Sequence, residues 1–582
     1  MESLPLEIFN WIISYLPLKD AAGCASVCRD WQAIIERETF ASLCLTPSRL
    51  SGFRKTLGFS VDSTHLQRRR SYVKHILFYA ILPEYDVSMP EMPEDRLQNN
   101  KAYTLAIKSL FETLSLWPDS DNCEVLLELR AQSPSDWDAE PDELKRRRRL
   151  KSVISGNTGD LLNIRWADSF LDIDGEAENL CLAPVVKHLD LRPGGSVTDL
   201  DQTPGEHRML SQATHSKIIS RLPQLRSVVM YPDDDERDDH AQRNSLREEF
   251  ALSLSTWPSS LRSLTMEYPG EPPENQNFPP LVRSIPGKDA LSLALNVLSQ
   301  QLESIKLTMM MTCPEILWPQ STTTQPYWPR LTQFHLSYTV ATPSGQWLFE
   351  RDPRWRDQTP DKITSDEGNS DDSENNSEDD LSDHSSDHIS DDSSDGSSDN
   401  ASDDASDDSS DDASDDSLNA LLDYFRDDPG DEGLDDESHE IADGFLPPQD
   451  ADPNLFRTKP LNILNNLYLA AGRAARQMPQ LKLMKLEACI DFDEGLNHVI
   501  TRGDPLHGFR YHRPSGVASW VSTSEFHVTK EVRDVWDAAA KGHGHRAIII
   551  ENLGFPKSQP DFNDPRVFDQ SFREKAEVFS WD

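Results

Sequence analysis

The sequence has 582 residues, of which 100 are Asp or Glu and 57 are Lys or Arg, so its formal net charge is -43. Residues 365–450 carry -32 of that charge, because they contain 33 acidic residues and a single basic one, Arg426. The remainder resembles an ordinary globular chain that is long enough for several domains or one repeat array. So negative a surface argues against binding nucleic acid through its phosphates.

The seven cysteines lie far apart in the chain and lack the close pairs of a zinc site or a disulfide framework. We therefore expect a reducing compartment, cytoplasmic or nuclear. The chain does not open on a basic segment, and it contains no run of 18 apolar residues. We expect neither secretion nor a membrane span.

Three short helices are predicted in the first forty residues. The first covers residues 4–17, with a proline near each end and two neighbouring apolar stripes. Asp20 is a candidate N-cap of the second helix, and the third contains Trp31. A unit this small, with surplus apolar surface and no metal or disulfide, needs a partner to cover it.

An L-P-x-E-I opening, a Y-L-P hinge and a V-C-R-x-W ending follow one another in residues 2–46, and this order resembles an F-box. The resemblance implies that a domain of residues 1–46 docks onto the Skp linker subunit of cullin-RING ubiquitin ligases, and through it onto a cullin. The positions that it assigns to this contact are Leu4, Pro5, Ile8, Leu16, Pro17, Val27, Cys28 and Trp31. The alternative is that these helices simply begin a larger core. Gly23 departs from the family's usual leucines and costs about 1 kcal/mol against Ala in a helix, so we expect weaker docking than for a leucine-rich member.

An L-x-x-L-x-L pattern recurs behind this domain and predicts short strands. Its six occurrences are Val186/Leu189/Leu191, Leu225/Val228/Met230, Leu261/Leu264/Met266, Leu302/Ile305/Leu307, Leu331/Phe334/Leu336 and Leu481/Met484/Leu486. Tyr72–Tyr79 and Val125–Arg130 are weaker strand candidates, and helical patterns at 291–298 and 464–478 alternate with the strands.

The fold class that follows is a multi-domain α+β chain. The repeats resemble the degenerate leucine-rich halves of fungal-type F-box proteins, although their spacing is longer and less regular than that of ordinary leucine-rich repeats. The resemblance implies an irregular α/β solenoid over residues 47–364, with the last repeat and a C-terminal cap in residues 451–582. We expect a strand pair within Phe509–Trp520, a helix that ends at Gly542 and a strand at Ala547–Ile550 in that last part. A compact α/β domain built from the same elements is the alternative.

Residues 365–450 are predicted to form a disordered insertion between two repeats. Between Ser365 and Ser417 there are 18 serines, 22 acidic residues and no Lys or Arg, which leaves nothing to offset chain entropy. Many of these serines precede acidic residues and resemble sites of acidophilic casein-type kinases. The segment is either a tolerated solvated insertion or a phosphorylation-tuned site for a basic partner such as histone tails.

Two basic runs stand out, Lys145–Lys151 and the shorter Arg68–Arg70. Three interpretations are open: a nuclear import signal, an ordinary exposed charged loop, or a clamp on the acidic insertion of the same molecule.

The sequence contains none of the phosphate-binding, dinucleotide-binding, hydrolase or zinc-protease motifs that we sought. His543 and His545 lack further ligands at metal-site spacing. We therefore predict no catalytic residue, cofactor or metal, and a protein that is not itself an enzyme.

These expectations combine into a substrate-recognition subunit of an SCF-type cullin-RING E3 ubiquitin ligase, acting in ubiquitin-dependent protein degradation. Its partners would be the Skp linker, a cullin and an unknown protein substrate, with no membrane and no nucleic acid. The outward strand residues are candidate substrate contacts, or simply solvated positions: Arg226, Arg262, Lys306, His335 and Lys485. The alternatives are an F-box scaffold without ligase activity and a nuclear factor that binds histones or other basic proteins through its acidic tract.

Overall fold

The computed structural model describes most of the chain outside the acidic segment. The described residues are Trp11, Tyr15, 23–58, 64–86, 91–117, 123–136, 170–175, 177–192, 208–232, 240–268, 279–320, 325–356, 455–488, 507–522, 526–546 and 548–554. The predicted insertion, 365–450, and the basic run Lys145–Lys151 lie outside them.

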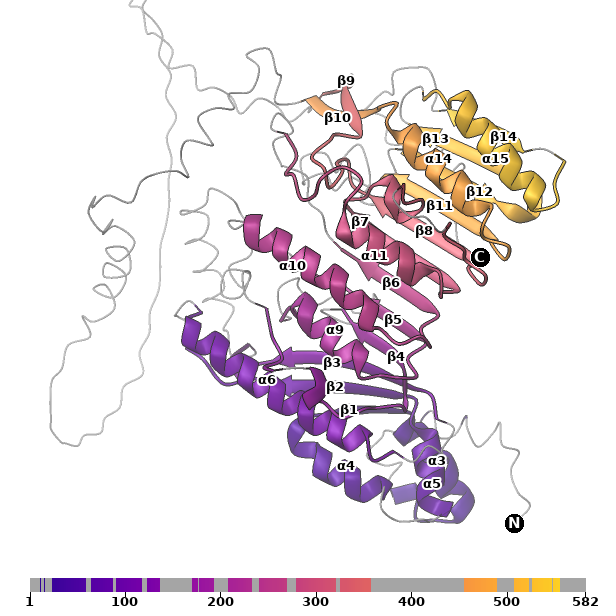
Figure 1. Ribbon diagram of the computed structural model, residues 1–582. Helices are drawn as coiled ribbons and strands as arrows, with labels where there is room; N and C mark the ends of the chain where they lie inside the picture. The colour runs from indigo at the N-terminus through magenta and orange to yellow at the C-terminus, as the bar shows by residue number, and fades with distance from the viewer. Residues whose placement is uncertain are drawn as a thin grey trace, which may run out of the picture. The chain divides into compact units, whose positions relative to one another are not determined.

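The described residues contain one twelve-stranded sheet whose strands follow each other in chain order (Figure 1). The strands are β1 (Ser42–Leu45), β2 (His75–Ile81), β3 (Val125–Gln132), β4 (Val186–Leu191), β5 (Ser227–Met230), β6 (Ser263–Glu267), β7 (Ser304–Met310), β8 (Gln333–Tyr338), β11 (Leu483–Ala488), β12 (His507–His512), β13 (Val517–Ser522) and β14 (Ile549–Gly554). Strands β1 to β8 and β11 are parallel, β12 is antiparallel to both of its neighbours, and β13 and β14 are parallel. Each of the six predicted repeat strands is present, as β4 to β8 and β11.

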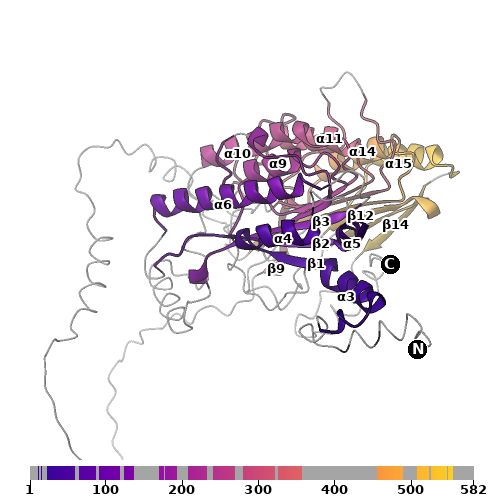
Figure 2. The same ribbon diagram turned by 90° about the horizontal axis from the view of Figure 1, so that it is seen from below.

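Most helices cover one face of this sheet. The described helices are α3 (Arg29–Ala41), α4 (Leu50–Leu57), α5 (Thr64–Tyr72), α6 (Pro93–Leu114), α9 (Gln212–Ser220), α10 (His240–Ser253), α11 (Ala290–Ser299), α14 (Leu464–Ala475) and α15 (Lys530–Gly542). Figures 1 and 2 show α6, α9, α10, α11, α14 and α15 together on the same face. Within the described residues, no helix is long and apolar enough to cross a membrane.

The core lies between the sheet and these helices because alternate strand residues are apolar. The middle residues of the six repeats fall in one register row, and each is at most 1% exposed. This row consists of Leu189, Val228, Leu264, Ile305, Phe334 and Met484. Burial of each such side chain stabilises the fold by about 1.5–3 kcal/mol. The repeat pattern in the sequence is thus the trace of one continuous apolar row.

The long interruption of the repeats falls between two neighbouring strands. Strand β8 pairs directly with β11, although 144 residues, 339–482, separate them. The chain leaves and re-enters through a separate antiparallel ribbon of β9 (Phe349–Arg356) and β10 (Leu455–Pro460). Residues 365–450 lie within this interval of the chain.

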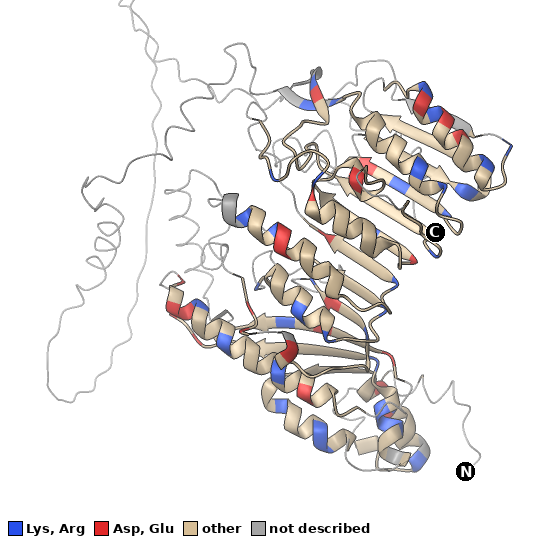
Figure 3. Cartoon of the chain, viewed as in Figure 1, with Lys and Arg blue, Asp and Glu red and all other residues tan. Residues whose placement is uncertain are grey.

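Two local expectations need correction. The early strand begins at His75 rather than Tyr72, which is still the last residue of α5. The run Arg68–Arg70 is not an exposed loop but part of α5, whose basic residues appear in Figure 3. Arg70 is 2% exposed and donates hydrogen bonds from Nη1 to the carbonyls of Leu57 (3.1 Å) and Gly58 (3.3 Å). Because it satisfies backbone acceptors in the interior, an import receptor cannot bind its guanidinium in this fold.

Candidate functional site

The sheet face opposite to the helices, here called the polar face, carries a row of charged side chains. Strand residues alternate between the two faces, so this row lies beside the apolar one. In register order from β3 to β12, it consists of Glu128, Asp190, Val229, Thr265, Lys306, His335, Lys485 and Arg510. Its first members are acidic and its last members are basic.

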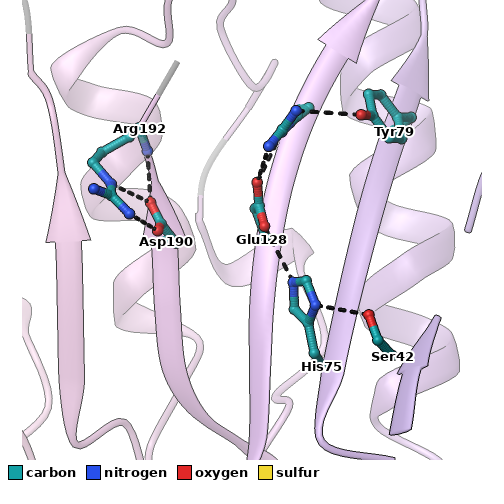
Figure 4. Close-up of polar contacts among 7 residues, drawn as sticks. Ser42, His75, Tyr79, Glu128, Asp190 and Arg192 are labelled. Carbon is teal, nitrogen blue, oxygen red and sulfur yellow. Dashed lines mark hydrogen bonds and ion pairs between the residues drawn. The ribbon is translucent and has the colours of Figure 1, made fainter. Parts of the chain in front are cut away.

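The acidic end is a closed hydrogen-bond network (Figure 4). Arg130 donates to Glu128 from Nε (2.8 Å) and Nη2 (2.5 Å), and its Nη1 lies 3.3 Å from the Tyr79 hydroxyl. His75 Nε2 lies 3.1 Å from the other carboxylate oxygen of Glu128. Since an ionised carboxylate only accepts, Nε2 donates to it, and Nδ1 lies 3.0 Å from the Ser42 hydroxyl.

The ionised form of Glu128 is favoured by this network. Burial raises the pKa of the Glu128 carboxyl, but the hydrogen bonds from His75 and Arg130 lower it further, so the net pKa is below its ordinary value. Asp190 is paired in the same way, with Arg192 Nη2 at 2.6 Å and Arg192 Nε at 3.1 Å. The acidic end is therefore neutralised by its own arginines.

The basic end gathers basic side chains around one buried carboxylate, Glu487. Glu487 is 7% exposed and accepts from Lys485 Nζ (2.6 Å) and His335 Nε2 (3.1 Å). Burial raises the pKa of Glu487, whereas His335 and Lys485 lower it more, so its carboxylate is ionised. Lys306, which is exposed, and Arg510 lie on the same row. Such a surface attracts an acidic group.

The structure brings three of the five predicted substrate contacts together. Lys306, His335 and Lys485 are direct neighbours in the polar-face row, although His335 is only 7% exposed. Arg226 and Arg262 instead precede β5 and β6 and lie at the strand-start edge of the sheet. Arg226 pairs with Glu124 there, and Arg262 Nε lies 3.7 Å from a carboxylate oxygen of Glu303.

Sequence reasoning missed the charged residues at both ends of this row. Glu128 and Arg130 are two residues apart in β3, a strand that the sequence predicted only weakly. This two-residue spacing was the signal that both side chains lie on the same face of the sheet. Arg510 gave no separate signal, because only the antiparallel pairing of β12 with β11 sets it beside Lys485.

The structure describes three of the eight residues that the sequence predicts to contact the Skp linker. Val27 is 67% exposed, Cys28 is exposed, and Trp31 packs, half-buried, against the small cluster of Ile34 and Ile35. The other five residues of the prediction lie outside the described residues: Leu4, Pro5, Ile8, Leu16 and Pro17.

Two further aromatic rings are exposed in the same part of the chain. Trp11 is 64% exposed and Tyr15 is 73% exposed, and their ring centroids are 5.7 Å apart, edge to face. Exposed aromatic groups of this kind are typical of a surface that a partner covers.

The two late histidines have structural contacts. His543 Nε2 lies 3.0 Å from the carbonyl of Ala475 and therefore donates to it, while its Nδ1 accepts from the Tyr511 hydroxyl at 2.9 Å. His545 Nε2 likewise donates to the carbonyl of Arg513 at 2.6 Å. In the part of the chain that the structure describes, no three His, Cys, Asp or Glu side chains are arranged to hold a metal ion.

Comparison with known families identifies two segments. Residues 1–46 match the model of the F-box-like family, so the chain carries an F-box-like domain at its N-terminus. Residues 454–559 match the model of a family of unknown function, DUF6546, and this match spans β10 to β14 with α14 and α15. No curated protein matches the chain.

Proposed function

We propose that this chain is the substrate-recognition subunit of an SCF-type cullin-RING E3 ubiquitin ligase, acting in the cytoplasm or the nucleus. The observation that carries the proposal is the F-box-like match over residues 1–46, since F-box domains generally bind the Skp linker and so a cullin. The chain would be an adaptor without a catalytic site of its own. Its contribution would be proximity, because it would hold a substrate beside an enzyme that carries ubiquitin.

Exposed apolar side chains support the linker contact. Val27 and Cys28 directly precede α3 and are exposed to solvent. Trp11 and Tyr15 add exposed aromatic surface. Burying such groups against a partner gains about 25 cal/mol for each Å² of apolar surface. The linker interface would therefore combine these residues with Leu4, Pro5, Ile8, Leu16, Pro17 and Trp31.

The sheet would present the substrate site. We interpret the strands in chain order, with helices on one face, as an irregular leucine-rich-repeat-like solenoid whose polar face binds the substrate. The exposed Lys306, in a row with Lys485 and Arg510, favours an acidic segment of that substrate. Helix α3 runs directly into β1, so the part of the chain that would bind the Skp subunit is joined to the sheet without an intervening loop.

The test is affinity purification of the full chain followed by mass spectrometry. A Leu4→Ala, Pro5→Ala, Trp31→Ala variant should lose linker and cullin subunits, and a Leu97→Ala, Leu105→Ala variant should keep them. Leu97 and Leu105 are exposed leucines of α6, 67% and 57% exposed, and so control for lost apolar surface. Linker and cullin retained by the first variant would contradict the proposal, and linker without cullin from the unmodified chain would identify a non-ligase scaffold.

The nuclear basic-protein-binding alternative rests on the charge of -32 in residues 365–450. Deletion of that segment distinguishes it from the ligase proposal. Loss of histones or other basic proteins from the purified material, with linker and cullin kept, would assign the segment a binding role of its own.

A further inference from the structure

A groove lies beyond the carboxyl ends of two neighbouring parallel strands. It has a volume of about 250 Å³, and its lining comes mainly from the segments that follow β7 and β8 and from α14. All of these segments belong to one compact unit of the chain. Ligands of open α/β sheets usually bind at this edge, so the groove lies where the fold favours a binding site.

The walls of the groove are largely apolar, and it continues into a second hollow. The apolar side chains are those of Trp318, Leu348, Ile463, Leu467 and Leu469. The second hollow, of about 550 Å³, shares Trp318, Gln320, Leu469 and Arg473 with the first. The first hollow is smaller than a typical small-molecule site, which measures roughly 300–1,000 Å³. Two joined hollows of this kind therefore suit a stretch of polypeptide, with one long side chain in the first and its neighbours in the second.

Glu315 contributes a buried carboxyl group to the first hollow. It lies in the 3-10 turn Pro314–Ile316, is 4% exposed, and forms no ion pair with any residue that the structure describes. Gly287 also lines the hollow, and a Cβ atom at that position would lie 3.5 Å from Glu315 Oε1. Because glycine has no Cβ, no side chain narrows the approach to the carboxyl group from this side.

The groups around Glu315 do not supply a counter-charge. Cys313, in the same lining, stays a neutral thiol, because burial and the charges of Asp289 and Glu315 raise its pKa. Asp289 is paired with Arg247, whose Nε and Nη2 lie 3.2 Å and 3.1 Å from its carboxylate oxygens. Lys288 is exposed but is not among the residues that line the groove. A carboxylate that is buried without a cation is costly, so a bound ammonium or guanidinium group is favoured at Glu315.

Arg473 brings the opposite charge to the wall that the two hollows share. It is exposed, and within the described part of the chain it forms no ion pair. Glu315 and Arg473 are the charged residues among those described that line the two hollows. The interior of the first hollow thus attracts a base, and the shared wall attracts an acid. The apolar walls suit the aliphatic stem of a lysine or arginine side chain, which packs along apolar surface behind its charged end.

We propose that this groove binds a polypeptide segment in which a basic side chain has an acidic neighbour. The basic side chain lies along Trp318 and Leu467 with its charged end at Glu315, and the neighbouring carboxylate meets Arg473. The site is separate from the polar face, because α14 covers the opposite face of the sheet (Figures 1 and 2). The proposal stands independently of the ligase role, since peptide binding to the chain is measured without the Skp subunit or a cullin.

Titration of the full-length chain with short peptides, followed by saturation-transfer NMR of the peptide, tests the proposal. The probe is acetyl-Asp-Lys-Asp-amide, which should bind. The same peptide with its lysine Nε-acetylated keeps the stem and both acids but loses the positive charge, so it should bind about tenfold more weakly or worse. Equal binding of the two peptides would overturn the proposal. Tighter binding of spermidine or free lysine than of the peptide would also overturn it, since a small amine would then be the occupant.

Matched variants assign the two charges. Glu315→Gln keeps the shape of the side chain and should weaken binding of the probe about tenfold, whereas Glu531→Gln removes an exposed acid of α15 and should leave it unchanged. Arg473→Gln should weaken the probe several-fold without affecting acetyl-Asn-Lys-Asn-amide, which has no acid for it to meet. Full affinity in Glu315→Gln, or an equal loss in Glu531→Gln, would overturn the proposal. Melting temperatures verify that each variant is folded, and the comparison of the two lysine peptides requires no variant at all.

Discussion

The carboxylate of Glu36 on α3 accepts two hydrogen bonds from Arg69 on α5, from Nη2 at 2.7 Å and from Nε at 3.1 Å. The guanidinium carbon of Arg69 lies 5.7 Å from the centre of the Phe40 ring. Glu36 also accepts from Gln32 Nε2 at 2.8 Å, one turn earlier on α3. The last helix of the F-box-like domain is thereby fixed to α5, which precedes the second strand of the sheet.

Replacement of Arg69 by Ala should destabilise this junction. The Glu36 side chain is 9% exposed, so its carboxylate would lose its main counter-charge while still largely buried. We expect a loss of about 1–3 kcal/mol in the free energy of unfolding, measured by urea denaturation. Arg37→Ala is the control, because Arg37 and its partner Glu38 are both exposed and the change in stability should be less than about 1 kcal/mol. Equal losses in both variants would contradict the role of the Glu36–Arg69 contact.

Gly472 should be intolerant of a larger side chain. A Cβ atom at this position of α14 would lie 2.5 Å from Val535 Cγ1 and 3.2 Å from Trp536 Nε1, both on α15. Gly472→Val should therefore push the two helices apart and lower the melting temperature, with a cost of about 1–3 kcal/mol. Gly52→Ala in α4 meets no atom within 4 Å and should raise stability by up to about 1 kcal/mol. A neutral Gly472→Val would show that α14 and α15 do not pack this closely.

Stability should fall in mild acid because of a buried histidine. Burial lowers the pKa of His507 to about 3, and its ring lies against Phe349, Tyr468 and Phe526. Between the unfolded pKa of about 6.5 and this folded value, the unfolded chain binds the proton and the folded chain does not, so stability is present above pH 6.5 and lost as the pH falls.

The loss attributable to His507 should be roughly 3 kcal/mol between pH 7 and pH 4. His507→Phe should flatten the dependence of the unfolding free energy on pH over that range, as measured by urea denaturation at several pH values. His215, whose pKa burial lowers to about 4, should leave a residual slope in this variant. Identical slopes with and without His507 would show that its ring is protonated in the folded chain.

Charge reversal on the polar face should weaken substrate retention. Lys306 is exposed in the row beside His335, so Lys306→Glu should reduce acidic binding partners several-fold without loss of the linker. Lys101→Glu makes the same charge change on the exposed side of α6 and should retain them. The comparison uses quantitative mass spectrometry of the purified complexes. Substrates lost equally from both variants would point to net charge rather than to this face.

The sequence predicted the strands well because their signal is local. Each repeat strand carries its own alternation of apolar residues, and the helices at 290–299 and 464–475 carry their own 3.6-residue pattern. The first domain was recognisable for the same reason, since its motifs are short runs with fixed spacing.

The charged contacts could not be predicted in this way. Arg70 looks like one of three exposed arginines in the sequence, yet it lies in the interior because Leu57 and Gly58, more than ten residues away, offer their carbonyls. Lys306 and Lys485 are 179 residues apart in the chain and become close neighbours only through the pairing of β7, β8 and β11.

The sequence by itself therefore determined the F-box-like start, the repeated strands and the position of the acidic tract. Only the tertiary structure decided which charges meet on the polar face and which arginines are buried. The physical reason is that periodicity within one element needs only neighbouring residues. Strand register and side-chain burial instead arise from packing between segments that are far apart in the chain.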